Sequence, residues 1–429
     1  MPNNPTPLGV KKGGKSMDPI TIRSVRPIVT APEGRPLVVV RVDTSEPELY
    51  GFGCATFTQR ALTVAHAVST YLAPWAQGRN VDDIEDIWQG AMASTFWRNG
   101  PILNAALSGL DMALWDIKGK RAGMPCYQLW GGKSREAAAV YRHADGSTLD
   151  EVVDNVARFV EEGYRFIRCQ WGGYGGMAGN SSAEEGVKFL NPNVHPPCGA
   201  LPGEYFDPHA YRRRVPELLA RIREEFGTTI ELLHDVHERL QPADAIRLAK
   251  DVEPFDLFFL EDLFPPEQVE WLSIVRQQST VPLAISELFT HPLEWMPLIT
   301  NRLIDFIRIH ISQIGGVTPA LKVAHLCELY GIRTAWQDPK DVSPLGHMAN
   351  LHIEIHAHNF GIHEWGGWGD HSPMVFRGLP EVRDGYMYPN TSPGWGMEID
   401  EEAAAAFPAT AQTLPSPVIR LPDGTAVWP

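Results

Sequence analysis

The chain has 429 residues, of which 44% are hydrophobic and 21% are charged, so it can bury a substantial core and is not a disordered protein. Its 37 basic and 52 acidic residues give a formal net charge of −15, which argues against nucleic acid or an anionic membrane as its main partner. The charge still allows a small anionic substrate, because a local cationic pocket or a metal ion can override it.

The N-terminal stretch and the cysteines indicate a cytoplasmic protein. Residues 1–16 are polar, rich in Pro and Gly and without the apolar core of a secretory signal, and they are predicted to be a disordered tail. No apolar run approaches the ~20 residues that a membrane span requires. The five cysteines are scattered and have no CxxC spacing, so we expect neither a disulfide scaffold nor a zinc ribbon.

Residues 17–132 are predicted to form an N-terminal α+β domain. Two β-branched stretches between residues 20 and 42, followed by YGFGCATFTQ, predict a hairpin or meander of strands. From about residue 60 to residue 122 the apolar residues recur at steps of three and four, which predicts helices. Strands followed by helices, without alternation, are typical of an α+β domain.

Residues 133–390 alternate between strand and helix patterns, apart from a Gly/Pro-rich insertion at 172–207, and predict an α/β fold. Polar residues end six predicted strands at intervals of 23 to 27 residues: Asp235, Glu261, Glu287, His310, Gln337 and Glu364. With strands at 141–143 and 168–170 the count reaches eight, which predicts a modified TIM barrel of the (β/α)7β kind. A doubly wound sheet is disfavoured, because no phosphate-binding Gly fingerprint follows its first strand. Residues 391–429 show no strand pattern and are predicted to pack on the N-terminal domain.

Three successive strands are predicted to end in a carboxylate, at Asp235, Glu261 and Glu287. On neighbouring barrel strands these side chains would converge, and they would repel one another unless a cation lay among them. An all-oxygen ligand set favours Mg²⁺. His234 and His237 could suggest zinc instead, but no third His or Cys follows at ligand spacing.

Long ordered motifs carry a family resemblance. They include LSGLDMALWDIKGKRAGMPCYQLWGG, YRHADGS, HDVHERL, SELF, IRIHISQIGG and NFGIHEW. In these the sequence resembles the enolase superfamily, and more narrowly the mannonate dehydratase-type subgroup of acid-sugar dehydratases, which includes starvation-sensing proteins. The resemblance implies that the N-terminal domain caps the barrel and that Mg²⁺ stabilises the enediolate formed when a sugar acid such as D-mannonate or D-gluconate loses its C2 proton. Loss of the 3-hydroxyl then gives a 2-keto-3-deoxy acid.

The resemblance also implies roles for three catalytic residues. His237, two residues after Asp235 and expected on the same face of the strand, would be the acid that protonates the leaving hydroxyl. Strand two carries no Lys base, and the subgroup instead pairs Arg168 with a loop Tyr, whose pKa the arginine would lower. Tyr174 in WGGYGG is our candidate for that base, with Tyr205 in PGEYFD as the alternative.

Further positions match substrate-binding positions of the subgroup: Thr58, His143, Arg308, His310, Gln337, Asp341 and Glu364. Two of them depart from its pattern. Gln337 stands where the subgroup usually has a His, and Thr58 stands where it usually has an Asn. Gln forms hydrogen bonds but cannot carry a proton, so the substrate could differ from D-mannonate or turnover could be weak.

The sequence is therefore compatible with three functions. A Mg²⁺-dependent sugar-acid dehydratase rests on the carboxylates, His237 and the Arg168–Tyr174 pair. A catalytically weak or inactive regulatory protein that binds the ligand without turnover would explain Gln337 and Thr58. An epimerase would need acid–base groups on both faces of C2, and the missing Lys and His argue against it. Relatives commonly form symmetric assemblies, so we expect a homo-oligomer.

Overall fold

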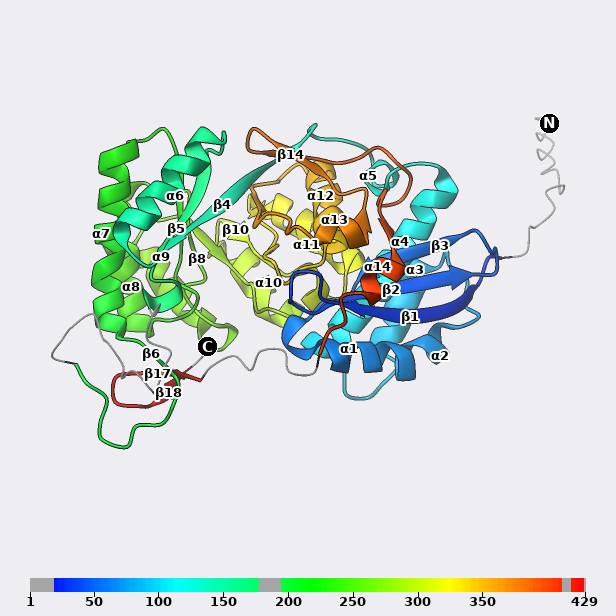
Figure 1. Ribbon diagram of the computed structural model, residues 1–429, viewed down its shortest axis with the longest axis horizontal. Helices are drawn as coiled ribbons and strands as arrows, with labels where there is room; N and C mark the ends of the chain where they lie inside the picture. The colour runs from blue at the N-terminus through cyan, green and yellow to red at the C-terminus, as the bar shows by residue number, and fades with distance from the viewer. Residues whose placement is uncertain (1–18, 177–193, 411–417, 428–429) are drawn as a thin grey trace, which may run out of the picture.

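A computed structural model describes residues 19–176, 194–410 and 418–427, and Figure 1 shows the arrangement of its elements. The blue and cyan elements of the N-terminal domain lie on one side, and the green and yellow barrel lies on the other. Within the described residues, no helix combines the length and the apolar character that crossing a membrane requires. The predicted tail, residues 1–16, lies outside the described residues.

The N-terminal domain places an antiparallel meander against helices, as its sequence pattern predicts. Its strands are β1 (Ile22–Thr30), β2 (Leu37–Thr44) and β3 (Tyr50–Cys54), and its helices are α1 (Ala61–Ala67), α2 (Ala73–Ala76), α3 (Ile84–Met92), α4 (Pro101–Ala122) and α5 (Cys126–Leu129). The long helix α4 lies directly on β3. A Cβ on Gly53 would overlap the carbonyl oxygen of Gly109, so glycine is what permits this close approach.

The barrel domain contains eight parallel strands in the order predicted from the sequence, namely β4 (Ala138–Gly146), β5 (Phe166–Trp171), β7 (Glu231–Asp235), β8 (Phe259–Glu261), β9 (Leu283–Ile285), β10 (Phe306–Ile307), β11 (Arg333–Thr334) and β12 (His363–Glu364). Seven helices connect them, namely α6 (Leu149–Glu161), α7 (Pro208–Phe226), α8 (Pro242–Asp251), α9 (Leu272–Gln278), α10 (Pro292–Thr300), α11 (Val317–Tyr330) and α12 (Pro344–His356). This is the predicted (β/α)7β succession.

Strand pairing carries the sheet around towards its starting point. β12 pairs with β4, and a parallel bridge joins Thr334 of β11 to Phe360, just before β12. The strands enclose a buried cluster of their own, made of Tyr141, Leu233, Phe259, Ala284, Phe306, Ala335 and Ile362. These side chains fill the barrel interior, so the polar residues beyond them are confined to the carboxyl ends of the strands.

The capping domain docks on the loop after β10. Trp88 Nε1 donates to the Gly315 carbonyl at 2.8 Å, and Asn104 Nδ2 donates to the Gln313 carbonyl at 2.8 Å. Asp111 of α4 accepts the Thr318 amide at 3.0 Å. These bonds fix the capping domain beside the carboxyl ends of the strands, where the predicted site lies.

The described residues between 391 and 427 lie against two different parts of the molecule. Trp395 donates its amide to Asp116 of α4 at 2.9 Å, and α14 (Glu401–Ala405) lies on β1. Residues 418–427 behave differently, because β17 (Ile419–Arg420) pairs with β6 (Glu204–Tyr205) and with β18 (Ala426–Val427) beside the barrel. Ile419 and Phe206 form a small buried cluster there. Two-residue strands leave no periodic pattern, which is why the sequence did not predict them.

The remaining strands and helices are short. Four more strands and one short helix lie between β12 and α14, namely α13 (Ser372–Val375), β13 (Phe376–Arg377), β14 (Glu381–Arg383), β15 (Tyr386–Tyr388) and β16 (Glu398–Ile399). β15 pairs antiparallel with the start of β4, and β13 pairs with β16. β14 and β15 therefore extend the barrel sheet at the amino-terminal end of β4, which is opposite the carboxyl ends where the site is predicted.

Candidate active site

Carboxylates gather where β7, β8 and β9 end. Asp235 and Glu261 are the last residues of β7 and β8, are paired in register and are both fully buried. Glu287 lies two residues beyond β9, after Ser286 has taken a positive φ of 112°. Oxygens of Glu261, Asp262 and Glu287 lie within 4.8 Å of one another. Neighbouring strands have therefore brought acids from distant parts of the sequence to one point.

The electrostatics of these acids fit a cation among them. Burial raises the pKa of Asp235 to about 6 and that of Glu261 to about 7, and repulsion between the acids adds to both. Burial and the charge of Asp262 raise the pKa of Glu287 well above its usual range. Glu261 Oε2 is buried with no hydrogen-bond donor among the described residues. A hard divalent cation would relieve the repulsion and use the unpaired oxygen.

Two buried arginines hold the acids from the barrel side. Arg168 Nη1 lies 3.2 Å from Asp235 Oδ2 and 3.4 Å from Glu261 Oε1. Arg308 Nη2 lies 2.9 Å from both Glu261 Oε1 and Glu364 Oε2. His143 Nε2 is 2.9 Å from the other oxygen of Glu364. Although burial opposes ionisation, Arg308, His143 and Arg168 together lower the pKa of Glu364 well below its usual range.

The loop after β5 places Tyr174 beside Arg168 and His237. Arg168 Nη2 donates to the phenol oxygen of Tyr174 at 2.8 Å, and the rings of Tyr174 and His237 lie 3.9 Å apart between centroids. The expected reason for the position of His237 is wrong, because β7 ends at Asp235 and His237 has a positive φ of 51°. Its amide donates to Asp235 Oδ1 at 2.7 Å, so a turn beside the carboxylate, and not an extended strand, positions the ring.

Arg168 lowers the pKa of Tyr174, as predicted, but burial raises that pKa by more. Burial raises the pKa of Tyr174 strongly, and Arg168 opposes this rise without reversing it. Burial, Arg239 and Arg168 lower the pKa of His237 to about 3, so the imidazole is neutral at pH 7 without a ligand. An added cation near Tyr174 and an added anion near His237 would each move these pKa values toward the range that proton transfer needs.

The alternative tyrosine lies elsewhere. Tyr205 is buried in β6, and its hydroxyl donates to the Leu201 carbonyl at 2.7 Å. His234 also takes a packing role, because its Nδ1 lies 2.8 Å from the Cys169 carbonyl oxygen and its Nε2 lies 3.0 Å from the Tyr211 hydroxyl. Arg168 therefore contacts Tyr174, in line with the first candidate.

Four of the remaining predicted residues form the side of the site under the capping domain. Gln337 Nε2 donates to Glu287 Oε1 at 3.1 Å, and its side chain also bonds Asp341. Thr58 Oγ1 donates to the Asp341 carbonyl at 3.4 Å. His310 accepts the Ser312 amide at 3.2 Å and its backbone bridges that of Gln337. Both positions that depart from the subgroup thus lie on the same side as Asp341.

Two further residues lie in the site that were not among the predicted ones. Asp262 follows Glu261 directly and belongs to the same acidic group. Only Glu261 of this pair was predicted as a ligand. Tyr141 accepts a hydrogen bond from Arg308 Nη1 at 2.9 Å, from deep in the barrel. The two consecutive acids Glu261 and Asp262 could have indicated Asp262. No local sequence pattern indicated Tyr141.

A cavity of about 460 Å³ opens beside these residues. Its lining includes residues of the site and several further charged residues, namely Arg168, Tyr174, His143, Gln170, Arg35, Arg142, Arg158, Lys340 and one acid, Asp145. Despite the acidic chain, cations dominate this lining. An anionic small molecule is the ligand that such a surface attracts.

Comparisons with known proteins agree with this geometry. A family described as "Enolase C-terminal domain-like" matches residues 151–403, and "Mandelate racemase / muconate lactonizing enzyme, N-terminal domain" matches residues 17–131. A D-galactonate dehydratase family member of Enterocloster bolteae is 52% identical over 413 residues, which cover 96% of this chain and 100% of the relative. The chain belongs to the D-galactonate dehydratase family.

Membership in the D-galactonate dehydratase family makes this protein one of the hydro-lyases of the enolase superfamily. A second member, RspA of Pantoea ananatis, is 51% identical over 418 residues, covering 96% of this chain and 100% of the relative. A crystal structure of an enolase from Pantoea ananatis with bound D-gluconate and Mg has a TM-score of 0.90 and 49% identity, covering 96% of this chain and 100% of that one. The superfamily and the fold of capping domain plus barrel are thus confirmed.

Proposed function

We propose that this protein is a Mg²⁺-dependent, mannonate dehydratase-type enzyme that converts a sugar acid of the D-mannonate or D-gluconate class to its 2-keto-3-deoxy product. The arrangement of Arg168, Tyr174 and His237 beside the carboxylates carries the proposal, because it places two proton-transfer groups together. The relative with bound D-gluconate and Mg supports the choice of ligand and ion.

Asp235, Glu261 and Glu287 are the proposed Mg²⁺ ligands. All three offer carboxylate oxygens. Glu261 and Glu287 lie in one acidic group with Asp262, and Asp235 is paired in register with Glu261. Glu261 Oε2 lacks a donor among the described residues. When bound, Mg²⁺ would stabilise the negative charge that develops on the substrate carboxylate as the C2 proton leaves. Asp262 Oδ1 accepts the Ser286 amide at 2.9 Å, so we assign it the role of holding the turn that presents Glu287.

Tyr174 is the proposed base. Its phenolate would take the C2 proton, and the hydrogen bond that Arg168 donates to the phenol oxygen stabilises that phenolate. The electron pair left at C2 then expels the 3-hydroxyl. His237 as imidazolium supplies the proton that converts this hydroxyl to water, and the enol that remains tautomerises to the 2-keto-3-deoxy acid. The substrate carboxylate favours the imidazolium, which offsets the effect of burial and the arginines on His237.

The other predicted positions are assigned to substrate binding. Arg308, His143 and Glu364 form one connected group that can bind hydroxyls from the barrel side. His310, Gln337, Asp341 and Thr58 lie toward the capping domain and are assigned the distal hydroxyls. Because Gln337 stands where the subgroup usually has His, the preferred stereoisomer is expected to differ from that of subgroup members that retain it.

A screen of aldonates tests the proposal. Purified protein with Mg²⁺ is incubated with D-mannonate, D-gluconate and D-galactonate, and the 2-keto-3-deoxy product is measured by a colour reaction specific for 2-keto acids. Product formation that a chelator abolishes supports the dehydratase. An aldonate that raises the melting temperature without being consumed would instead establish a regulatory binding protein. Failure of every aldonate to bind the Mg²⁺-loaded protein would overturn both.

The localisation and the oligomeric state that we propose are those predicted from the sequence. We place the enzyme in the cytoplasm as a homo-oligomer, and size-exclusion chromatography with light scattering measures the assembly directly. A monomer at all concentrations would contradict that part of the proposal.

A further inference from the structure

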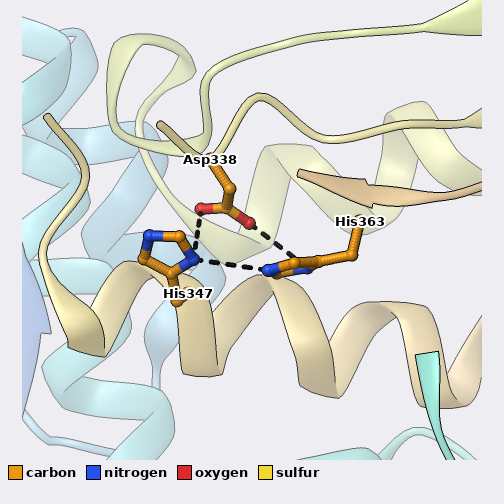
Figure 2. Close-up of side chains that lie close together, drawn as sticks. All are labelled: Asp338, His347 and His363. Atoms are coloured by element: carbon orange, nitrogen blue, oxygen red, sulfur yellow. Dashed lines mark hydrogen bonds and ion pairs between the residues drawn. The ribbon is translucent and has the colours of Figure 1, made fainter. Parts of the chain in front are cut away.

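A second group of possible metal ligands lies behind the candidate active site, on the side of β11 and β12. Figure 2 shows Asp338, His347 and His363 pointing toward one another. Each offers a donor atom within 4.8 Å of the others, and all three residues are buried. None of these three residues is among the acids of the candidate active site, which are Asp235, Glu261, Asp262 and Glu287.

The fold assembles this group from three separate elements. Asp338 follows β11, His363 begins β12, and His347 lies on α12. Asn350 and Glu354 lie three and seven residues beyond His347, so all three project from one face of that helix. The helix face and the two strand ends therefore surround one buried point.

The distances suit a tetrahedral ion. His347 Nδ1 lies 3.3 Å from His363 Nε2 and 3.6 Å from Asp338 Oδ1. Donor atoms at about 2.0–2.2 Å from a tetrahedral zinc ion are roughly 3.3–3.6 Å apart. The two separations from His347 are thus those of ligands that share one ion. His363 and Asp338 approach each other through Nδ1 and Oδ2 at 3.5 Å, and their candidate ligand atoms lie within 4.8 Å.

The surrounding hydrogen bonds orient the donors as metal ligands are oriented. His363 Nδ1 lies 2.8 Å from Glu354 Oε2, which leaves His363 Nε2 directed at His347. Asn350 Nδ2 donates to Asp338 Oδ2 at 2.7 Å, while Asp338 Oδ1 has no hydrogen-bond donor among the described residues. A carboxylate that binds the far nitrogen of a histidine is the usual support of a metal-bound imidazole.

A divalent cation would also balance the charge of this group. Asp338 and Glu354 are both fully buried, and within the described part of the chain their only ion pairs are with His347 and His363. A proton on His363 would compensate one negative charge and would leave Asp338 Oδ1 without a donor. A divalent ion would compensate both charges and bind that oxygen.

We propose that Asp338, His347 and His363 form a second metal site, selective for a divalent transition metal such as Zn²⁺ over Mg²⁺. Two imidazole nitrogens and one carboxylate oxygen are the ligand set that zinc accepts, whereas Mg²⁺ prefers oxygen. His347 also lines a cavity of about 330 Å³ bounded by Glu33 and Lys340, which provides a path for the ion.

The proposed role of this ion is to hold the floor of the active site. The Asp338 amide donates to Glu364 Oε2 at 3.0 Å, and Glu364 in turn binds Arg308 and His143. An ion on the Asp338 side chain would fix its backbone and, through it, Glu364. The site is thus structural, and binding does not depend on the proposed dehydratase activity.

Metal analysis of the purified protein tests the proposal. Chelator-treated Glu287→Gln protein, in which the carboxylate site is disabled, is dialysed against Zn²⁺ in excess Mg²⁺, and bound zinc is counted by mass spectrometry. We expect one zinc per chain in this background and none after adding His363→Gln. Glu354→Gln should weaken zinc binding by about 10–100-fold. His325→Gln, at an exposed position on α11, is the matched control and should retain the zinc.

Absence of zinc in the Glu287→Gln protein, or zinc that survives His363→Gln, would overturn the proposal. Titration of the unmutated, chelator-treated protein with Co²⁺ gives a reading that does not depend on whether the variants fold. A visible absorption band of tetrahedral Co²⁺ that excess Zn²⁺ removes supports the site. No such band at saturating Co²⁺ would refute it.

Discussion

The barrel domain contains two groups of buried carboxylates, and different side chains balance their negative charge. Asp235 and Glu261, at the ends of β7 and β8, lie against Arg168 and Arg308. Asp338 and Glu354, beside β11 and on α12, lie against histidines. Guanidinium groups keep their charge at every accessible pH, whereas an imidazole can exchange its proton for a metal ion.

The choice between arginine and histidine partners determines which ions each group can bind. Permanent cations beside the first group favour ionised acids, and Glu261 Oε2 keeps no donor among the described residues, as a site for a hard ion needs. The histidines of the second group offer nitrogen donors in a buried setting, as a structural transition-metal site needs. Substitutions in and around the two groups test this contrast.

Glu287→Gln should remove nearly all dehydratase activity. Loss of a carboxylate ligand weakens Mg²⁺ binding, and the several kcal/mol of charge stabilisation that the ion supplies corresponds to on the order of 10⁴-fold in kcat. Steady-state kinetics with the aldonate found by the screen measure the effect. Glu270→Gln, at an exposed position after β8, is the control and should retain activity. Full activity of Glu287→Gln would contradict the assignment of the first group.

Tyr174→Phe should lower kcat by about 10³-fold while the substrate still binds. The variant lacks the oxygen that takes the C2 proton, and general bases typically contribute 10²–10⁴-fold. Exchange of the C2 proton with deuterated solvent, followed by NMR, isolates this step from the loss of water. Tyr205→Phe is the matched control, because its hydroxyl bonds Leu201 away from Arg168. Equal losses in the two variants would argue against Tyr174 as the base.

Arg308→Met should destabilise the Mg²⁺-free protein by about 3–5 kcal/mol. The change leaves Glu261 and Glu364 without their nearest cation in a buried setting. Urea unfolding measures the free energy. Arg158→Met breaks the exposed pair with Glu162 and should cost less than about 1 kcal/mol. A loss of similar size in both variants would show that burial does not distinguish these ion pairs.

His352→Leu should make stability less sensitive to acid. His352 is fully buried on α12 between Tyr127 and Trp395, and burial lowers its pKa from 6.5 to about 3. The folded state therefore resists protonation, so its contribution to stability is complete above pH 6.5 and falls as the pH decreases toward 3.

At pH 5.5 this loss amounts to about 1.4 kcal/mol relative to neutral pH. Urea unfolding of both proteins at pH 5.5 and pH 8 measures it, and the pH 8 comparison isolates the change in packing. An unchanged pH dependence would contradict the role of His352. The result also sharpens the contrast on one helix, because His347 of α12 faces a carboxylate whereas His352 faces aromatic rings.

The barrel and the first carboxylate group could be predicted because their signals are local. Alternating strand and helix patterns recur at a nearly constant interval, and Asp235, Glu261 and Glu287 follow that interval. The neighbouring strands then bring the acids together without further information from the sequence.

Other features depend on contacts that no local pattern records. The turn that places His237 depends on its amide bond to the Asp235 side chain. Asp338, His347 and His363 are brought together only by the packing of α12 between two strand ends. Asp338 and His347 are nine residues apart, and His347 and His363 are sixteen residues apart. Neither interval is a recognisable metal-binding spacing, so the sequence does not indicate this group.

The small sheet that joins the C-terminal segment to β6 has a practical consequence. Ile419 packs on Phe206, and Phe206 lies against Gly175, the neighbour of Tyr174. The last residues of the chain thus buttress the loop that carries the proposed base, although they are far from it in sequence. A deletion of residues 418–427 would remove this buttress, so recombinant protein meant for kinetics should retain them.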